Sequence, residues 1–184
     1  AYYSMDERMV TDYPLVDITE RIATATPIKY PMAGMDSHHV TLHIYNMKTG
    51  KELIVKTGEP AEQYLTAITW NPDNSRIYIG VLNRGQNDLK FNEYNAKTGE
   101  LMQTIFEDTD EQYVEPQGPA YFLPNNSDQF IWKAQRDGYY HLYLYTISKA
   151  QVKQLTHGDF VITDFCGFSK DGKNIYYRST EVSQ

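Results

Sequence analysis

The sequence has little cysteine and no long apolar run. Its one cysteine, Cys166, rules out an internal disulfide. It lies in the apolar run 161–168, and no residue pattern supplies a base for it, so we expect a small buried hydrophobic side chain rather than a nucleophile. No apolar stretch approaches the roughly 18 residues of a membrane-spanning helix. The sequence therefore predicts no membrane span, and no signal peptide is recognisable.

Basic residues and helical patterns are also scarce. Lysine and arginine number 17 against 24 acidic residues, a net charge of −7, which excludes a general nucleic-acid surface. No window of about twelve residues keeps a helical period, and the best candidate is one short turn at 61–67. Sixteen tyrosines and seven phenylalanines instead favour strands.

A strand-turn-strand pattern occurs three times. In each copy an aromatic residue, Trp70, Phe122 or Phe168, ends one strand, and a polar turn leads into the next. The copies are 52 and 46 residues apart, and periods of about 40–50 residues built from short strands are typical of propeller blades. Residues 1–7 resemble residues 175–181, so we expect a segment of a longer array.

The repeat predicts the remaining strands. Gly50 and Gly99 end similar turns and are expected to take positive φ. The run 142–145 is wholly apolar or aromatic, which suits a strand packed on both faces. We expect second strands at 76–82, 129–134 and 174–179, third strands at 89–95 and 140–148, and fourth strands at 52–57, 101–106 and 151–156.

These patterns predict an all-β fold, a partial β-propeller of about three blades, each with four antiparallel strands. The blade-like units would be 1–58, 59–107, 112–157 and a partial unit at 158–184, all of one propeller domain. The stretch 10–39 has three prolines and no clean repeat, so we interpret it as a long insertion between strands. Three blades cannot close a ring, so the isolated segment should expose apolar faces and associate with itself.

Four motifs in order resemble one known family. They are Ile28–Gly34 followed by Ser37–Thr41, then Leu82–Asn87, Tyr113–Pro116 and Arg136–Tyr143. Together they resemble the propeller of the dipeptidyl peptidase IV family, and in particular its bacterial branch with prolyl tripeptidyl aminopeptidase. The resemblance covers nearly the whole chain.

The resemblance implies a serine exopeptidase with an N-terminal eight-bladed propeller and a C-terminal α/β-hydrolase domain. Such enzymes remove dipeptides or tripeptides from peptide N-termini, usually after proline. Their nucleophile lies in a Gly-x-Ser-x-Gly motif, which this sequence lacks. The chain would therefore shape and gate substrate access, without catalytic residues, cofactor or metal, and would be inactive alone. The expected partners are proline-containing peptides, the hydrolase domain and a second copy of the parent, in the periplasm or at the surface of a bacterium.

The same resemblance places the segment around Tyr113, Glu115 and Gln117 in the extended substrate pocket. Glu115 could pair with an ammonium group, and Tyr113 could form an apolar wall. The alternative is an ordinary loop between blades with an exposed glutamate. Arg84 could point toward the central cavity, or could belong to a structural turn.

Two further clusters favour no special chemistry. His38, His39 and His43 could suggest a metal site. No cysteine completes a zinc pattern, however, so we interpret them as structural or surface residues. The acidic run 108–111 lacks the spacing of a calcium loop and is predicted to be a solvated loop. His141 and His157 stand alone and receive no role.

Two other classes of function remain open. A stand-alone propeller that binds proteins, of the TolB or WD40 type, would show the same period and turns. A carbohydrate-binding propeller is supported only by the abundance of aromatic residues, and two tryptophans are few for that purpose.

Overall fold

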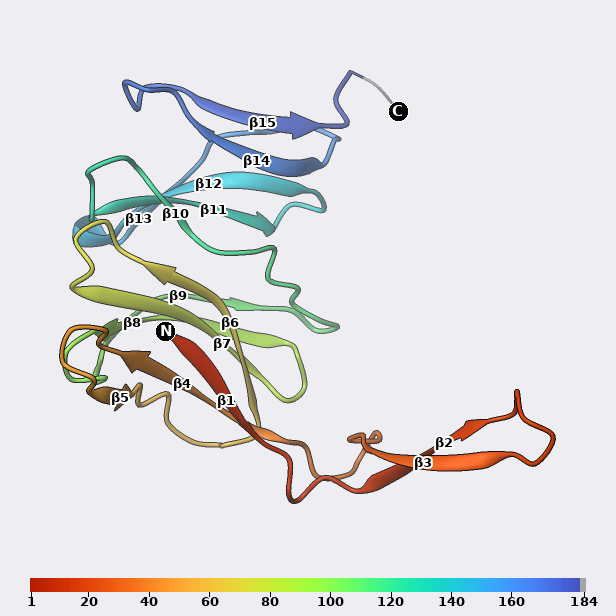
Figure 1. Cartoon of the computed structure of the whole chain (residues 1–184). Helices are drawn as coiled ribbons and strands as arrows, with labels where there is room; N and C mark the ends of the chain where they lie inside the picture. Colours follow the sequence, from red (N-terminus) through yellow and green to blue (C-terminus); the bar gives the residue numbers. More distant parts are fainter. Residues whose placement is uncertain (183–184) are drawn as a thin grey trace. The chain divides into compact units, whose positions relative to one another are not determined.

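The computed structural model describes residues 1–182, and within this range the regular elements are β-strands apart from one short 3-10 turn (Figure 1). The all-β prediction is thus confirmed. The chain divides into two compact units after Gln63. Each unit is built from antiparallel strands that are mostly consecutive in the chain.

The first unit contains a three-stranded sheet and a separate hairpin. The turn between β4 and β5 has the form expected from the sequence: the Asn46 side chain accepts a hydrogen bond from the N–H of Lys48 (3.0 Å), and Gly50 has a φ of 68°. The sheet has the order β1-β4-β5, with β1 at Tyr2–Asp6, β4 at His39–Tyr45 and β5 at Glu52–Ile54.

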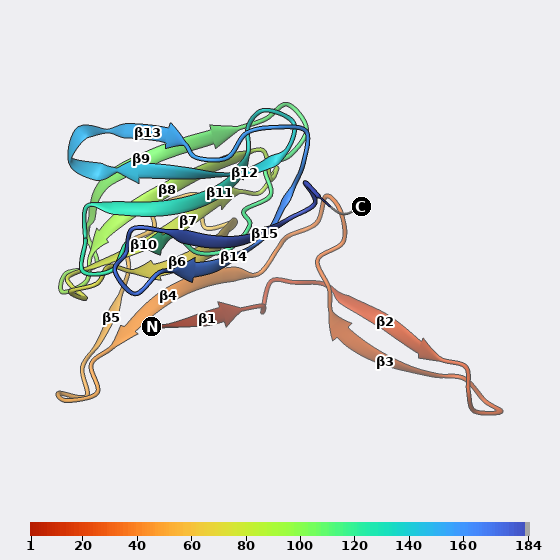
Figure 2. The ribbon, with the colours of Figure 1, turned by 90° about the horizontal axis from the view of Figure 1, so that it is seen from above.

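The predicted insertion at 10–39 lies between β1 and β4 and contains the hairpin. Its strands are β2 (Asp12–Asp17) and β3 (Thr24–Lys29), and all of their residues are exposed. The hairpin lies apart from the three-stranded sheet of its own unit (Figures 1 and 2). The residues of β2 and β3 therefore do not contribute to the core of that unit.

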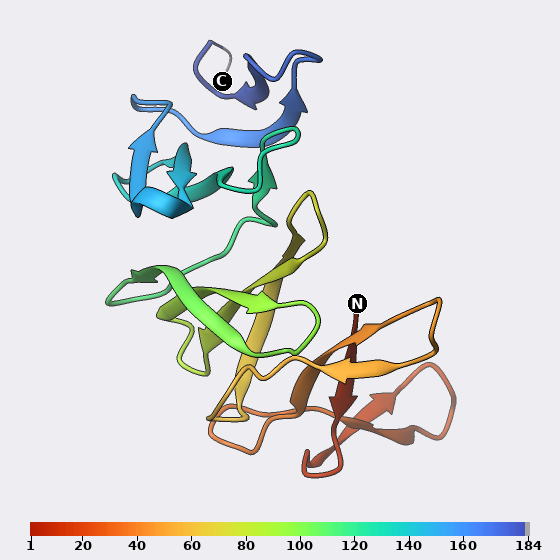
Figure 3. The same cartoon turned by 90° about the vertical axis from the view of Figure 1, so that its left-hand side faces the viewer.

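The second unit contains two four-stranded sheets and a two-stranded one. The strand order in each follows the chain, so each sheet is a series of hairpins (Figure 3). The first sheet consists of β6 (Gln63–Trp70), β7 (Arg76–Asn83), β8 (Asp88–Asn95) and β9 (Leu101–Thr109). The second consists of β10 (Tyr121–Phe122), β11 (Gln129–Gln135), β12 (Tyr140–Thr146) and β13 (Gln151–Gln154), and the last pair is β14 (Ile162–Phe168) with β15 (Ile175–Ser179).

The three repeated turns lie where the sequence predicts them. Trp70, Phe122 and Phe168 are the last residues of β6, β10 and β14. In the first copy, the side chain of Asn71 accepts a hydrogen bond from the N–H of Arg76 (3.0 Å), which closes the turn. The division of the chain into blade-like units with the boundaries given above remains a prediction.

Some local predictions are wrong, and the fourth strands predicted at 52–57 and 151–156 end earlier, at Ile54 and Gln154. Residues 61–67 do not form a helical turn, because β6 begins at Gln63 and pairs with β7. Within this strand Ala67 has a positive φ of 54°. The strand predicted to reach Ser148 ends at Thr146, because the Asp128 carboxylate accepts a hydrogen bond from the N–H of Ser148 (2.7 Å) and holds the 3-10 turn η1 (Ile147–Lys149).

The prediction that Cys166 is buried is also wrong, since this residue is exposed. The pairing of β14 with β15 shifts between Phe165 and Gly167, so Cys166 is the unpaired residue of a bulge. A bulge changes the direction of the side chain relative to regular alternation. The apolar neighbours of Cys166 in the sequence therefore gave no guide to its exposure.

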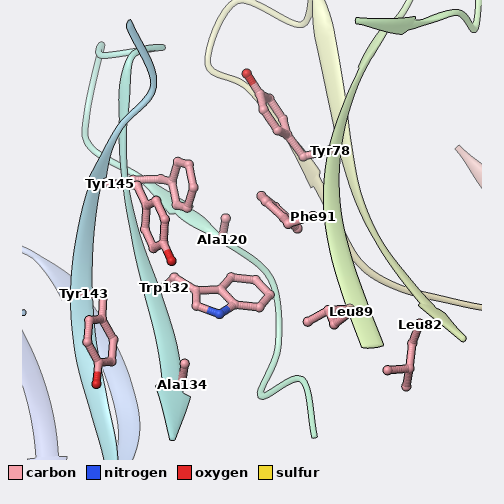
Figure 4. Packing of buried hydrophobic residues seen from close by; sticks show 10 residues of the cluster. Tyr78, Leu82, Leu89, Phe91, Ala120, Trp132, Ala134, Tyr143 and Tyr145 are labelled. Carbon is pink, nitrogen blue, oxygen red and sulfur yellow. The ribbon is translucent and has the colours of Figure 1, made fainter. Parts of the chain in front are cut away.

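An aromatic core joins the two four-stranded sheets of the second unit. Trp132 of β11 is 1% exposed and its ring lies 4.9 Å from that of Phe91 (Figure 4). The same ring lies 5.2 Å from that of Phe106. As predicted, β12 packs on both faces. Tyr143 and Tyr145 belong to this core, whereas Leu142 packs with Ile162 of β14 in a separate cluster.

Candidate functional site

A cavity of about 390 Å³ lies between the end of β9, the segment that follows it, and the ends of β11 and β12. We call it the loop cavity. It is wholly contained in the second unit and combines carboxylates, cations and aromatic rings. Its lining residues are Leu89, Asp108, Thr109, Asp110, Gln112, Tyr113, Val114, Glu115, Pro116, Trp132, Lys133, Ala134, Gln135, Arg136, Gly138 and Tyr140.

Glu115 is held at this cavity by Tyr140. The phenol of Tyr140 donates a hydrogen bond to Oε2 of Glu115 (3.0 Å) and accepts one from Nε2 of Gln117 (3.2 Å). Burial and the hydrogen bond to Glu115 raise the pKa of Tyr140 to about 12. The phenol is therefore a hydrogen-bond donor at neutral pH, and Glu115 keeps other carboxylate lone pairs for a ligand.

The polar turn at 84–87 supports the loop that carries Glu115. The N–H of Val114 donates to the carbonyl of Gln86 (2.8 Å), and the N–H of Asp110 donates to the carbonyl of Asn87 (3.1 Å). Arg84 itself donates to the hydroxyl of Tyr64 and lies 5.8 Å from the centre of that ring. The backbone of this turn, more than the Arg84 side chain, is therefore connected to the loop cavity.

An ion pair separates the loop cavity from a second cavity. Nε and Nη2 of Arg136 donate to Oδ1 of Asp108 (3.0 and 2.6 Å), and Nη2 also donates to the hydroxyl of Tyr145. The two charged side chains are 27% and 18% exposed. Both also line a cavity of about 320 Å³ between β9 and the region of η1 and β13, which we call the strand cavity.

Three aromatic rings surround the guanidinium group of Arg136. Its central carbon lies 4.9 Å from the ring centre of Tyr143 and 5.5 Å from those of Phe106 and Tyr145. Burial lowers the pKa of Arg136, but Tyr145 and Asp108 raise it more, so the net shift is upward. The group is therefore a fixed positive charge held by stacking and by hydrogen bonds.

The residues selected from the sequence have different positions. Tyr113 and Glu115 both line the loop cavity, with Tyr113 62% exposed. Gln117 is connected to it through Tyr140, and Arg84 is not among its lining residues. Their functional roles remain predictions.

Sequence reasoning missed three residues of the site. It assigned Asp108 to a solvated loop, but Asp108 lies in β9 and is mostly buried against Arg136. It gave no role to Tyr140 or to Arg136, which belong to a motif used only for the family resemblance. The only sequence feature that pointed to Arg136 was its position just before an aromatic-rich strand. No local pattern links it to Asp108, which lies 28 residues earlier.

Two histidines outside these cavities, His43 and His141, have structural partners. His43 contacts Thr41 and Glu52, each at 2.8 Å. His141 is fully buried, with its ring nitrogens 3.0 Å from the hydroxyl of Thr156 and from the carbonyl of Gly158. Among residues 1–182, no three His, Cys, Asp or Glu side chains gather as a metal site would require, and no helix is both long and apolar enough to cross a membrane.

Comparison with known families identifies the class of protein. The model of the dipeptidyl peptidase IV N-terminal region matches residues 1–184. The chain therefore belongs to this family and forms part of the family's β-propeller.

Solved structures and a curated relative agree with this assignment. A Bacteroides ovatus protein, whose name assigns it to dipeptidyl aminopeptidase IV, is 42% identical with a TM-score of 0.89, over 97% of this chain and 28% of that one. Dipeptidyl peptidase 4 of Porphyromonas gingivalis is 25% identical with a TM-score of 0.81, over 97% and 25%. A protein of Aspergillus flavus named as a dipeptidyl peptidase 4 is 25% identical, over 98% and 25%. The chain thus spans about a quarter of the length of these relatives.

Proposed function

We propose that this chain is the non-catalytic propeller portion of a serine exopeptidase that removes dipeptides or tripeptides from peptide N-termini, usually after proline. We call the whole enzyme the parent protein. Family membership supports the class of enzyme. The observation that carries the role of this chain is the carboxylate of Glu115, held by Tyr140 at the edge of the loop cavity.

In this proposal, the loop cavity receives the amino-terminal end of the peptide, and the propeller shapes and gates its access. A free N-terminus is an ammonium group, and Glu115 offers it a charge-assisted hydrogen bond. The exposed ring of Tyr113 would cover an apolar side chain of the peptide. The triad would come from a C-terminal α/β-hydrolase domain of the parent protein.

Peptidase activity of the parent protein tests the class of function. We expect cleavage of chromogenic Xaa-Pro or Xaa-Xaa-Pro substrates, loss of activity when the serine of the hydrolase motif is replaced, and no activity in residues 1–184 alone. The preferred substrate length would distinguish dipeptide from tripeptide release. A parent protein that cleaves neither substrate and instead binds defined protein partners would support the alternative of a stand-alone binding propeller.

Glu115→Gln tests the role of the loop cavity. Loss of a charged hydrogen-bond partner should lower kcat/KM by about 10- to 100-fold, chiefly through KM, because the ammonium group would lose its anchor before the chemical step. Steady-state kinetics with Xaa-Xaa-Pro substrates measure both constants. The matched control is Glu111→Gln, which removes the same charge from an exposed residue outside the cavity lining. Equal effects of the two variants would contradict the proposed site.

We also propose that the parent protein is bacterial, works in the periplasm or at the cell surface, and forms a homodimer. The bacterial relatives with known structures support a bacterial origin. The exposed hairpin β2–β3 supports the homodimer, because the apolar side chains of Tyr13, Leu15 and Ile28 are exposed to solvent. Fractionation of cells, with detection of the parent protein, tests its location.

A further inference from the structure

We propose that Arg136 is a positioning residue, which holds the loop that carries Glu115 in its binding geometry through the ion pair with Asp108. The inference rests on the proposed function of the loop cavity. It concerns a residue that does not need to contact the peptide itself.

The connection between Arg136 and the loop is short. Asp108 is the second-last residue of β9, and Asp110 and residues 112–116, which follow directly, line the loop cavity. Two hydrogen bonds from the guanidinium group fix Asp108 where this segment leaves the sheet. A displaced Asp108 would therefore move the start of the loop.

The far side of the same loop is held by two further contacts. The N–H groups of Asp110 and Val114 donate to the carbonyls of Asn87 and Gln86. These backbone hydrogen bonds require the loop to leave β9 in the observed direction. Arg136 and the 84–87 turn thus hold the loop from two sides. Glu115 directly follows Val114, whose N–H donates to this turn.

The surroundings of Arg136 make its position rigid. The rings of Phe106, Tyr143 and Tyr145 lie close to the guanidinium group, and the Tyr145 hydroxyl accepts one of its N–H groups. A planar group stacked in this way loses little further entropy when it binds a carboxylate. The contacts also join β9 of one sheet to β12 of the next, so both sheets fix the position of the loop.

Removal of the guanidinium group in the parent protein tests the inference. We expect Arg136→Met to raise KM for Xaa-Pro or Xaa-Xaa-Pro peptides about tenfold with kcat unchanged, equally for peptides with neutral, basic and acidic side chains. Arg136→Lys should raise KM less than Arg136→Met does, since lysine keeps the positive charge but lacks the fork geometry of the guanidinium group. Asp108→Asn with Arg136→Met should be no worse than either single change, because both remove the same interaction.

Hydrogen exchange gives a second measurement that does not depend on activity. In Arg136→Met the amides of Asp110 and Val114 should exchange at least about tenfold faster, while amides of β7 keep their rates. The matched control is Lys90→Met, which removes a cation that pairs with Glu107 (3.3 Å) on the exposed face of the same sheet. This variant should leave both KM and loop exchange unchanged.

Three results would overturn the inference. Unchanged exchange in the loop would show that Arg136 does not hold it. A loss confined to acidic peptides would show that Arg136 binds substrate directly. A fall in kcat with uniformly faster exchange would show a general structural role. If the wild-type parent protein cleaves no peptide, the proposed function fails, yet the exchange measurement still decides whether Arg136 holds the loop.

Discussion

Replacement of Trp132 by alanine is expected to lower the local free energy of unfolding by about 3–5 kcal/mol. The indole is almost completely buried and contacts Phe91 and Phe106 of the neighbouring sheet. Its removal would leave a cavity between two sheets, where strands on both sides are fixed by their own ladders and cannot collapse into the space. Because the same residue lines the loop cavity, ligand affinity should also fall.

Native-state hydrogen exchange of the parent protein measures this effect. The slowest amides of β8 and β11 should exchange at least about 100-fold faster in the variant. Trp70→Ala is the matched control, because Trp70 is only partly buried and lies outside the aromatic core, so its loss should cost less. Similar changes for the two tryptophans would show that the contacts between the sheets do not govern stability here.

The double change Leu15→Thr with Ile28→Thr is expected to convert the proposed dimer into a monomer. Tyr13 pairs with Ile28 and Leu15 pairs with Thr26, so these side chains form one face of the hairpin. Leu15 is 56% exposed and Ile28 is 39% exposed. Their replacement should not harm the fold, but the loss of two central apolar contacts should raise the dimer dissociation constant about 100-fold or more.

Sedimentation equilibrium of the parent protein over a concentration series measures that constant. Val16→Thr is the matched control, since Val16 pairs with Ala25 and lies on the opposite face of the hairpin. It should leave the dimer intact. An unchanged dissociation constant in the double variant, or an equal effect of the control, would place the dimer interface elsewhere.

The sequence predicts local features of this fold well because their causes are local. The turns at Asn46 and Asn95 each depend on one asparagine side chain and on a glycine four residues later, with φ of 68° at Gly50 and 72° at Gly99. A bulge is different: it depends on how two strands align, so the exposure of Cys166 could not be read from neighbouring residues.

The candidate site shows the same division. Tyr113 and Glu115 were found because they stand together in one family motif, and the structure brings both to one cavity. Tyr140 is 25 residues from Glu115, and Arg136 is 28 residues from Asp108. Such pairs come together only when two sheets pack, so periodicity and turn chemistry carry no information about them.

The arrangement of the second unit also has a consequence for its folding kinetics. Every ladder within its sheets joins strands that follow one another in the chain, so each ladder closes only a short loop and should form fast. The contact between Phe91 and Trp132 instead joins residues from different sheets and can form only after both sheets exist. We therefore expect sheet docking, and not hairpin formation, to limit the folding rate of this unit, so that mutations in its aromatic core slow refolding more than mutations in its turns.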